Sequence, residues 1–204
     1  RDGAQTQGVD FSIEDKEKIA SALDNLGVDY IEGGWPGANP TDTEFFQKKH
    51  NFKNSKLTSF GMTKRSGRSA ENDTGLSAIM NSNTSAVCLV GKSWDFHVDI
   101  ALGITNEENL DNISESAKHF VKAKKEFMFD AEHFFDGYKA NSKYAISCIK
   151  AAYDQGARWI VLCDTNGGTL PHEVTQIVSE VSKVVPGKNL GIHAHNDTGN
   201  AVAN

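Results

Sequence analysis

Apolar positions follow two spacings that alternate along the chain. Residues 84–91 are almost continuously apolar, which predicts a strand buried on both faces. Over residues 107–124, apolar side chains recur every three or four positions, which predicts a helix with one buried stripe. By the same criteria we predict strands over 28–32, 56–61, 84–91, 126–129, 158–163 and 190–195, and helices over 13–26, 41–49, 73–80, 94–102, 107–124, 142–155 and 170–185.

Capping residues place several of these boundaries. Ser12 precedes two acidic residues and is expected to cap the first helix, which Gly27 should end. Thr169 is expected to cap the helix that begins at Leu170, and residues 131–138 are expected to form a loop. The inward face of the first helix is predicted to comprise Ile19, Leu23 and Leu26.

Strands that alternate with helices imply a parallel sheet in an α/β fold. The predicted units average roughly 30 residues, the size of a βα repeat, and eight of them make a TIM barrel of about 250 residues. The 204 residues supply between six and seven units. We therefore predict that residues 1–204 form one domain, an incomplete (β/α)8 TIM barrel without its first strand and last βα unit, and expect the chain to be a segment cut at both ends.

Composition narrows the range of partners. The formal net charge is −6 and no basic run is present, which argues against a nucleic-acid or membrane surface. No apolar run approaches the length of a transmembrane helix. Cys88, Cys148 and Cys163 lie in apolar surroundings without metal-site spacing, so we expect reduced core thiols in a cytoplasmic protein. A small metabolite is the expected partner.

The clearest candidate chemistry lies at predicted strand ends. His193 and His195 are two residues apart, so they should project from one face of their strand, where two imidazoles can hold one divalent metal ion. In a barrel, polar residues at the carboxyl ends of the strands meet at one mouth. With Asp2 as a carboxylate, the set suits Zn²⁺, Mn²⁺ or iron, and a chelating substrate also admits Mg²⁺. The other residues expected at this mouth are Arg1, Glu32, Asp130 and Thr165.

These residues also carry a family resemblance. The segments Arg1-Asp2-Gly3-Ala4-Gln5 and His193-Ala194-His195-Asn196-Asp197, with Glu32 between them, resemble the metal-dependent TIM-barrel family of 2-isopropylmalate, homocitrate and citramalate synthases and hydroxymethylglutaryl-CoA lyases. The order and spacing agree over essentially the whole chain, although only the last part of the family's first-strand pattern is present. Segments 33–37, 91–95, 129–138 and 163–171 look like the citramalate synthase branch.

The resemblance implies an acyltransferase that condenses acetyl-CoA with a 2-oxo acid, pyruvate in this branch, to form (R)-citramalate for isoleucine biosynthesis. It implies that Asp2, His193 and His195 bind the metal ion and that Arg1 stabilises the charge on the substrate keto oxygen. Glu32 would orient Arg1, or be an ordinary solvated acid. Thr165 would donate to the substrate carboxylate, or only cap a local turn.

Other activities stay open at this point. The same residues could serve a 2-isopropylmalate or homocitrate synthase, a carbon–carbon lyase acting on a 3-hydroxyacyl-CoA, or a non-catalytic barrel that binds a small acid. Family members also use an asparagine near the metal ion and a catalytic base beyond the end of this chain. Because an incomplete barrel also leaves strand edges unpaired, the isolated segment is expected to be unstable and nearly inactive. A homodimer is expected for the longer protein.

Overall fold

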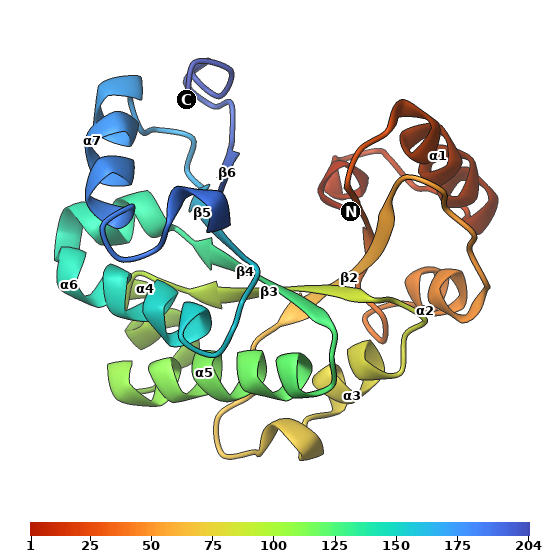
Figure 1. Cartoon of the computed structure of the whole chain (residues 1–204), viewed down its shortest axis with the longest axis horizontal. Helices are drawn as coiled ribbons and strands as arrows, with labels where there is room; N and C mark the ends of the chain where they lie inside the picture. Colours follow the sequence, from red (N-terminus) through yellow and green to blue (C-terminus); the bar gives the residue numbers. More distant parts are fainter.

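A single parallel sheet organises the molecule. The computed structural model describes residues 1–204, and its strands pair in sequence order from β1 to β6. The sheet curls, so that β1 and β6 lie on either side of an opening (Figure 1). This confirms the predicted parallel α/β fold and the curvature of an incomplete barrel. The strands are β1 (Tyr30–Gly34), β2 (Lys56–Met62), β3 (Ala86–Lys92), β4 (Glu126–Glu132), β5 (Trp159–Asp164) and β6 (Leu190–Ala194).

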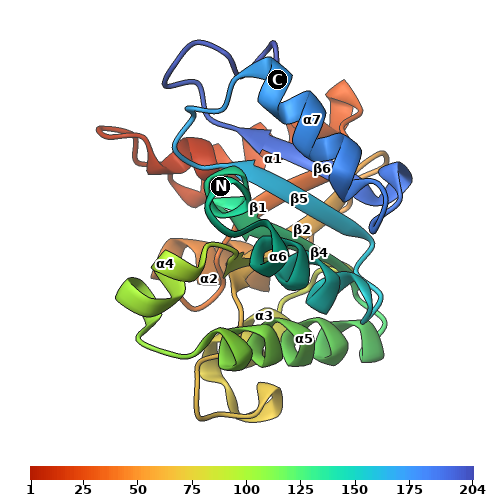
Figure 2. The same ribbon diagram turned by 90° about the vertical axis from the view of Figure 1, so that its left-hand side faces the viewer.

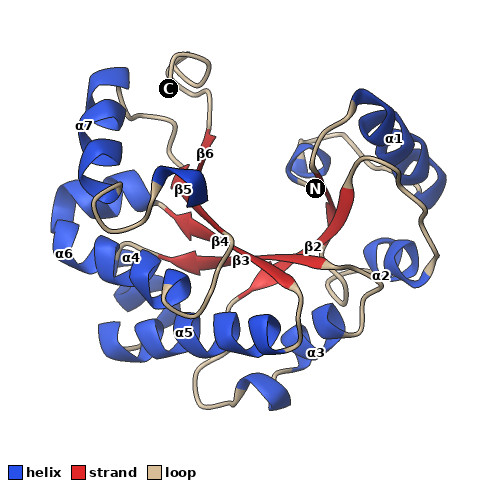
Figure 3. Ribbon diagram, viewed as in Figure 1, coloured by secondary structure: helices blue, strands red, loops and turns tan.

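Helices cover the outer side of the curled sheet (Figure 3). Figure 2 shows the same arrangement after a quarter turn, with α5 and α6 against one side of the strands. None of the helices is long and apolar enough to cross a membrane. They are α1 (Ile13–Leu26), α2 (Pro40–Gln47), α3 (Thr74–Met80), α4 (Asp95–His97), α5 (Asn106–Lys122), α6 (Phe134–Tyr153) and α7 (Pro171–Val181), with short turns η1 (Asp2–Gln5), η2 (Ala70–Asn72), η3 (Val98–Leu102) and η4 (Gly187–Asn189).

The main core lies between the sheet and its outer helices. Ile113, Ala117 and Phe120 of α5 are fully buried, which confirms the stripe predicted for that helix. Phe120 stacks on Phe127 of β4 with ring centroids 6.2 Å apart. All three cysteines are buried and free of disulfide bonds, as expected for core thiols. The large apolar area removed from water here fixes the helix layer on the strands.

Helix α1 has the predicted boundaries but not the predicted inward face. Ser12 accepts a hydrogen bond from the Asp15 backbone N–H, Asp15 accepts one from Ser12, and Gly27 ends the helix with a φ of 87°. Ile19 and Leu26, however, are 41% and 76% exposed, so their predicted core positions are wrong. Because α1 packs at the edge of the sheet, it buries only a narrow face around Ala20.

Two further expectations are corrected near strand ends. The predicted loop over residues 131–138 is mostly regular structure, because β4 continues to Glu132 and α6 begins at Phe134. His133 alone makes the turn, with a φ of 55°, and the buried Phe134 then anchors the helix. Thr169 is not the cap of α7, which has Leu170 in that position; the Thr169 hydroxyl instead donates to Asp164.

Asp73 supports a prediction about stability. Its buried carboxylate accepts the backbone N–H of Leu76, which caps α3, and the backbone N–H of Arg65. Burial raises the pKa of Asp73, but these hydrogen bonds outweigh that effect and the pKa is lowered. We expect Asp73→Ala to reduce the free energy of unfolding by about 2–4 kcal/mol in urea denaturation.

The pH dependence and a control follow from the same geometry. Because the folded pKa of Asp73 is depressed, its contribution is present above the unfolded pKa of about 3.9 and is lost as the pH falls through the folded value. Ser12→Ala removes a cap of the same kind at an exposed position and should cost less. Equal losses for the two variants would contradict the role given to the buried carboxylate.

Candidate active site

The carboxyl ends of the strands meet around a cavity of about 250 Å³. The alternation of side chains along each parallel strand aims polar groups from several strands at this one mouth. Of the residues singled out in the sequence, the cavity is lined by Arg1, Asp2, Asp130, Thr165, His193 and His195. Glu32 is not in its lining but contacts Arg1.

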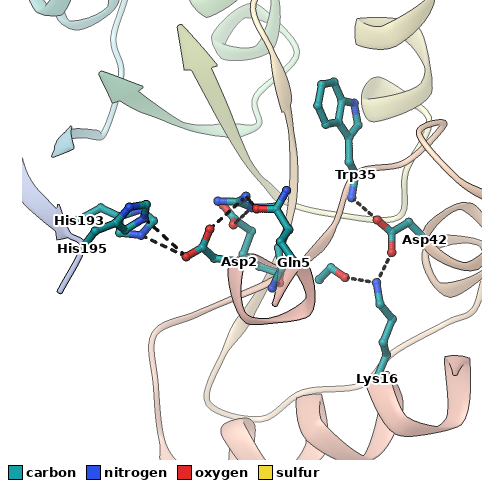
Figure 4. Close-up of polar contacts among 10 residues, drawn as sticks. Asp2, Gln5, Lys16, Trp35, Asp42, His193 and His195 are labelled. Atoms are coloured by element: carbon teal, nitrogen blue, oxygen red, sulfur yellow. Dashed lines mark hydrogen bonds and ion pairs between the residues drawn. The ribbon is translucent and has the colours of Figure 1, made fainter. Parts of the chain in front are cut away.

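Asp2, His193 and His195 form a three-residue cluster across the opening of the sheet. The Asp2 Oδ2 atom lies 3.5 Å from His193 Nε2 and 3.8 Å from His195 Nε2. Figure 4 shows both histidine rings facing the Asp2 carboxylate. Two ligand atoms that share a cation at about 2.1 Å lie roughly 3.0–3.4 Å apart, so these separations are close to those of a metal site. The 3₁₀ turn η1 carries Asp2, and β6 carries the histidines.

The hydrogen bond of His195 fixes which ring nitrogen is free. His195 Nδ1 lies 2.8 Å from the carbonyl oxygen of Thr165, which can only accept, so Nδ1 must carry the proton. In the neutral form of the ring, the lone pair of Nε2 is then directed toward the carboxylate of Asp2. Because both groups are then electron donors, a cation between them would stabilise the arrangement, as would a proton on Nε2. A histidine that binds a metal ion through one ring nitrogen usually donates the N–H of its other ring nitrogen to a carbonyl or carboxylate, as His195 does here.

Arg1 is held from three directions beside this cluster. Its Nε donates to Glu32 Oε2 at 2.5 Å, and its Nη1 donates to Gln5 Oε1 at 3.1 Å. The guanidinium carbon lies 3.8 Å from the ring centroid of Phe60, a stacked cation–π contact. Burial lowers the pKa of Arg1, but Glu32 outweighs it and the pKa is raised. Arg1 therefore keeps its charge and a fixed orientation at the cavity.

Asp130 is the buried acid of the cavity. Burial, and next the charge of Glu32, raise its pKa to about 7, while Arg1 opposes this shift. A carboxyl group that titrates near neutral pH can hold or accept a proton there. Burial also raises the pKa of the neighbouring Cys163 thiol well above its usual value, so this cysteine is a neutral wall of the cavity rather than a nucleophile.

Sequence reasoning missed five lining residues, namely Gln5, Phe60, Val90, Glu132 and Cys163. Glu132 lies two positions after Asp130 on β4, and its Oε2 is 2.5 Å from Lys92 Nζ. The period-2 rule would have found it, had the strand not been ended at residue 129. Phe60 gave no signal, because nothing in an apolar strand residue indicates that an arginine will stack on it.

Thr165 lies beside the cluster, and its hydroxyl oxygen already accepts one hydrogen bond. Its Oγ1 accepts the backbone N–H of His133 at 2.9 Å, and its carbonyl holds His195. The hydroxyl proton is therefore still available for a substrate group. Thr165 thus links the turn after β4 to the histidines of β6.

Asp164 holds the loop that contains Thr165, which supports a second prediction. Its carboxylate is buried and accepts the backbone N–H of Thr169 at 3.1 Å and the Thr169 hydroxyl at 2.9 Å. Its carbonyl accepts the backbone N–H of His195. We expect Asp164→Asn to weaken divalent-cation binding about tenfold in isothermal titration, because an amide cannot accept both bonds and the support of His195 loosens.

Asp24→Asn provides a matched control for that measurement. Asp24 is also buried, and its carboxylate accepts backbone N–H groups from residues 53–55, far from the cavity. Both variants should lower the melting temperature, whereas only Asp164→Asn should change cation affinity. Equal cation affinity in the two variants would show that Asp164 only supports the fold.

Comparison with known proteins relates the chain to one family. The HMGL-like family model matches residues 1–204. The (R)-citramalate synthases of Aquifex aeolicus and Sulfolobus acidocaldarius are 53% and 48% identical over 206 residues, which covers 100% of this chain and 39% of each relative. A homocitrate synthase of Saccharolobus islandicus is 32% identical over 204 residues, covering 100% of this chain and 43% of that protein.

Solved structures show the same fold at lower sequence identity. A hydroxymethylglutaryl-CoA lyase of Acinetobacter baumannii, in complex with coenzyme A and 3-methylmalate, superposes with a TM-score of 0.81. It is 21% identical, and the match covers 100% of this chain and 67% of that structure. The chain spans 39% of the length of the citramalate synthases that it matches.

Proposed function

Because the chain belongs to the HMGL-like family, we propose that it forms the catalytic part of an acyltransferase that condenses acetyl-CoA with pyruvate to give (R)-citramalate. The observation that carries the proposal is the convergence of Asp2, His193 and His195 beside a fixed Arg1 at one cavity. The named citramalate synthases, identical at 53% and 48% across the whole chain, favour pyruvate over the larger 2-oxo acids.

The proposed reaction forms one carbon–carbon bond and breaks one thioester. The acetyl methyl group loses a proton, and its carbon attacks the keto carbon of pyruvate. Water then cleaves the thioester carbonyl from sulfur, which releases coenzyme A and citramalate. During the attack, two electrons move onto the keto oxygen, so negative charge develops on that atom and has to be stabilised there.

Members of the family depend on a divalent metal ion. The fit to this chain rests on the ligand atoms of Asp2, His193 and His195, which lie within 4.8 Å of one another, and on the Thr165 carbonyl that leaves Nε2 of His195 as the nitrogen facing Asp2. Asp2, His193 and His195 would hold the ion, proposed as Mn²⁺, Zn²⁺ or Mg²⁺, which would act as a Lewis acid on the keto group of the substrate. Three protein ligands leave positions for a chelating 2-oxo acid.

Arg1 supplies the permanent charge for the keto oxygen. Glu32 and Gln5 occupy only two of its N–H groups, so others remain to donate to the developing oxyanion. Stacking on Phe60 and the ion pair with Glu32 hold the guanidinium in place before the charge forms, which is the arrangement that favours a transition state. We assign Glu32 the role of orienting Arg1, and the Thr165 hydroxyl the role of donating to the substrate carboxylate.

Thiol release provides the direct test. The longest natural reading frame that contains residues 1–204 is incubated with acetyl-CoA and pyruvate, and free coenzyme A is measured with a thiol reagent. Release that depends on pyruvate supports the proposal, and no release contradicts it. Faster release with 2-oxoisovalerate or 2-oxoglutarate would instead indicate a 2-isopropylmalate or homocitrate synthase, and cleavage of a 3-hydroxyacyl-CoA would indicate a lyase.

Removal of the metal ion gives a further prediction. Treatment with EDTA followed by desalting should reduce thiol release to below about 1% of its starting rate, since the polarisation of the keto group is lost. Re-addition of Mn²⁺, Zn²⁺ or Mg²⁺ in separate samples should restore it and rank the three ions. Full activity after chelation, with metal absent by elemental analysis, would rule out the proposed mechanism.

The proposal also covers the cellular location and the oligomeric state of the protein. We place the protein in the cytoplasm, supported by three buried cysteines that form no disulfide. A homodimer remains a prediction from the family resemblance and is tested by light scattering on the longest reading frame.

A further inference from the structure

His133 forms the turn between β4 and α6 in a backbone conformation that few side chains adopt. Its φ of 55° lies in the left-handed region, and the only other non-glycine residue with a positive φ is Lys124. In this conformation its backbone N–H donates to Oγ1 of Thr165 at 2.9 Å. We propose that His133 is a positioning residue, which directs the Thr165 hydroxyl toward the carboxylate of the 2-oxo acid. The inference rests on the proposed function, because it explains how one contact to that substrate is prepared.

The hydrogen bond from His133 restricts what the Thr165 hydroxyl can do. A hydroxyl group has one proton to donate and two lone pairs with which it accepts. In a turn, a threonine hydroxyl often bonds to nearby backbone groups and is then lost to a ligand. Here the N–H of His133 occupies one accepting position on Oγ1, and Thr165 lines the cavity. The proton of the hydroxyl is therefore left for an acceptor inside the cavity.

The first turn of α6 fixes the position of His133. The carbonyl of His133 accepts the backbone N–H of Gly137 at 2.9 Å. Gly137 packs so closely on the loop after β3 that a Cβ atom there would lie 2.5 Å from the carbonyl oxygen of Ser93. Phe134 and Phe135 are fully buried in the core. Because the helix is held in this way, the turn cannot relax by moving it, and His133 has to keep its left-handed conformation.

The imidazole ring of His133 is held from two sides. Its centroid lies 4.3 Å from that of His97, in an edge-to-face arrangement. Its Nδ1 atom is buried without a hydrogen bond and lies 3.5 Å from Oδ2 of Asp136. The same carboxylate oxygen accepts a hydrogen bond from Nδ2 of Asn166 at 2.9 Å. His133 is therefore tied to the loop after β5 at two successive residues, directly at Thr165 and through Asp136 at Asn166.

The expected contribution of His133 is to substrate binding and not to the chemical step. The substrate carboxylate keeps its charge while the carbon–carbon bond forms, so a contact to it is equally strong before and during the reaction. Loss of such a contact raises KM and leaves kcat unchanged. This pattern separates His133 from Arg1 and from the metal ligands, whose loss should lower kcat.

Substitutions with different backbone preferences at position 133 test the assignment in the longest reading frame. Valine is β-branched and disfavours a positive φ, whereas asparagine adopts it readily. We expect His133→Val to raise the KM for pyruvate at least about tenfold, with kcat and the KM for acetyl-CoA within about twofold. His133→Asn should restore most of the wild-type KM for pyruvate. If His133→Val does not fold, His133→Ala should show the same effect at about threefold.

Lys124→Val provides the matched control for backbone strain. Lys124 has a φ of 60°, is exposed, and precedes β4 at the end opposite to His133. The two valine variants should lower the melting temperature to a similar extent, whereas only His133→Val should change the KM for pyruvate. An unchanged KM for pyruvate in a folded His133→Val variant would overturn the proposal.

A double-mutant cycle with Thr165→Val identifies the group through which His133 acts. If His133 acts through the Thr165 hydroxyl, the double variant should have the KM for pyruvate of Thr165→Val alone. If the two increases multiply instead, His133 acts by another route and the proposal is wrong. Titration of pyruvate into the Mn²⁺-loaded protein repeats the cycle without turnover. Pyruvate binding without thiol release in the wild type would contradict the proposed function while this titration still decides on His133, and absence of both would overturn the two proposals together.

Discussion

Replacement of His195 by alanine is expected to weaken divalent-cation binding by more than about 100-fold and to abolish thiol release. The reason is that Nε2 of His195 is one of three donor atoms around the proposed ion, and its orientation is fixed by the Thr165 carbonyl. Loss of a supporting residue alone usually costs about 10–100-fold in metal affinity, so loss of a ligand should cost more. Titration with Mn²⁺ and the thiol assay measure the two effects, and His193→Ala should behave in the same way.

His172→Ala is the control for these histidine variants. His172 is exposed in the first turn of α7 and lies outside the cavity. Its replacement should leave both Mn²⁺ affinity and thiol release unchanged. Wild-type Mn²⁺ affinity in His195→Ala would show that the cluster does not bind the ion, whatever the effect on the reaction rate.

Arg1→Lys is expected to lower kcat by about 10²–10³-fold, with smaller changes in both KM values. Loss of one well-placed oxyanion donor typically has an effect of this size. Lysine retains the charge, but it lacks the planar fork that donates to Glu32 and Gln5 while it stacks on Phe60. The lysine ammonium group would therefore have no fixed position at the keto oxygen.

Arg158→Lys controls for the general effect of this substitution. Arg158 also stacks on an aromatic ring, with its guanidinium carbon 3.9 Å from the centroid of Trp159, and it donates to the carbonyl of Lys188. It precedes β5, at the opposite end of the sheet from the cavity. The variant should keep wild-type kcat. More than half of the wild-type kcat in Arg1→Lys would contradict the role proposed for Arg1.

Much of the fold could be predicted because its signals are local. The stripe of α5, the continuous apolar run of β3 and the caps around α1 each depend on residues close in sequence. The errors arose where a distant partner overrides the local pattern. Residues 131–138 look like a loop until the burial of Phe134 and Phe135 anchors a helix there, and Ile19 looks internal until α1 is found at the edge of the sheet.

For the candidate site, the sequence by itself determined which side chains end the strands, since alternation along β6 and the order of βα units follow from local spacing. Only the tertiary structure decided the distances and the supports. The curl of the sheet brings Asp2 to the histidines of β6, places Phe60 under Arg1, and buries Asp130 enough to raise its pKa to about 7. These effects depend on through-space contacts between residues far apart in the chain, which no local pattern encodes.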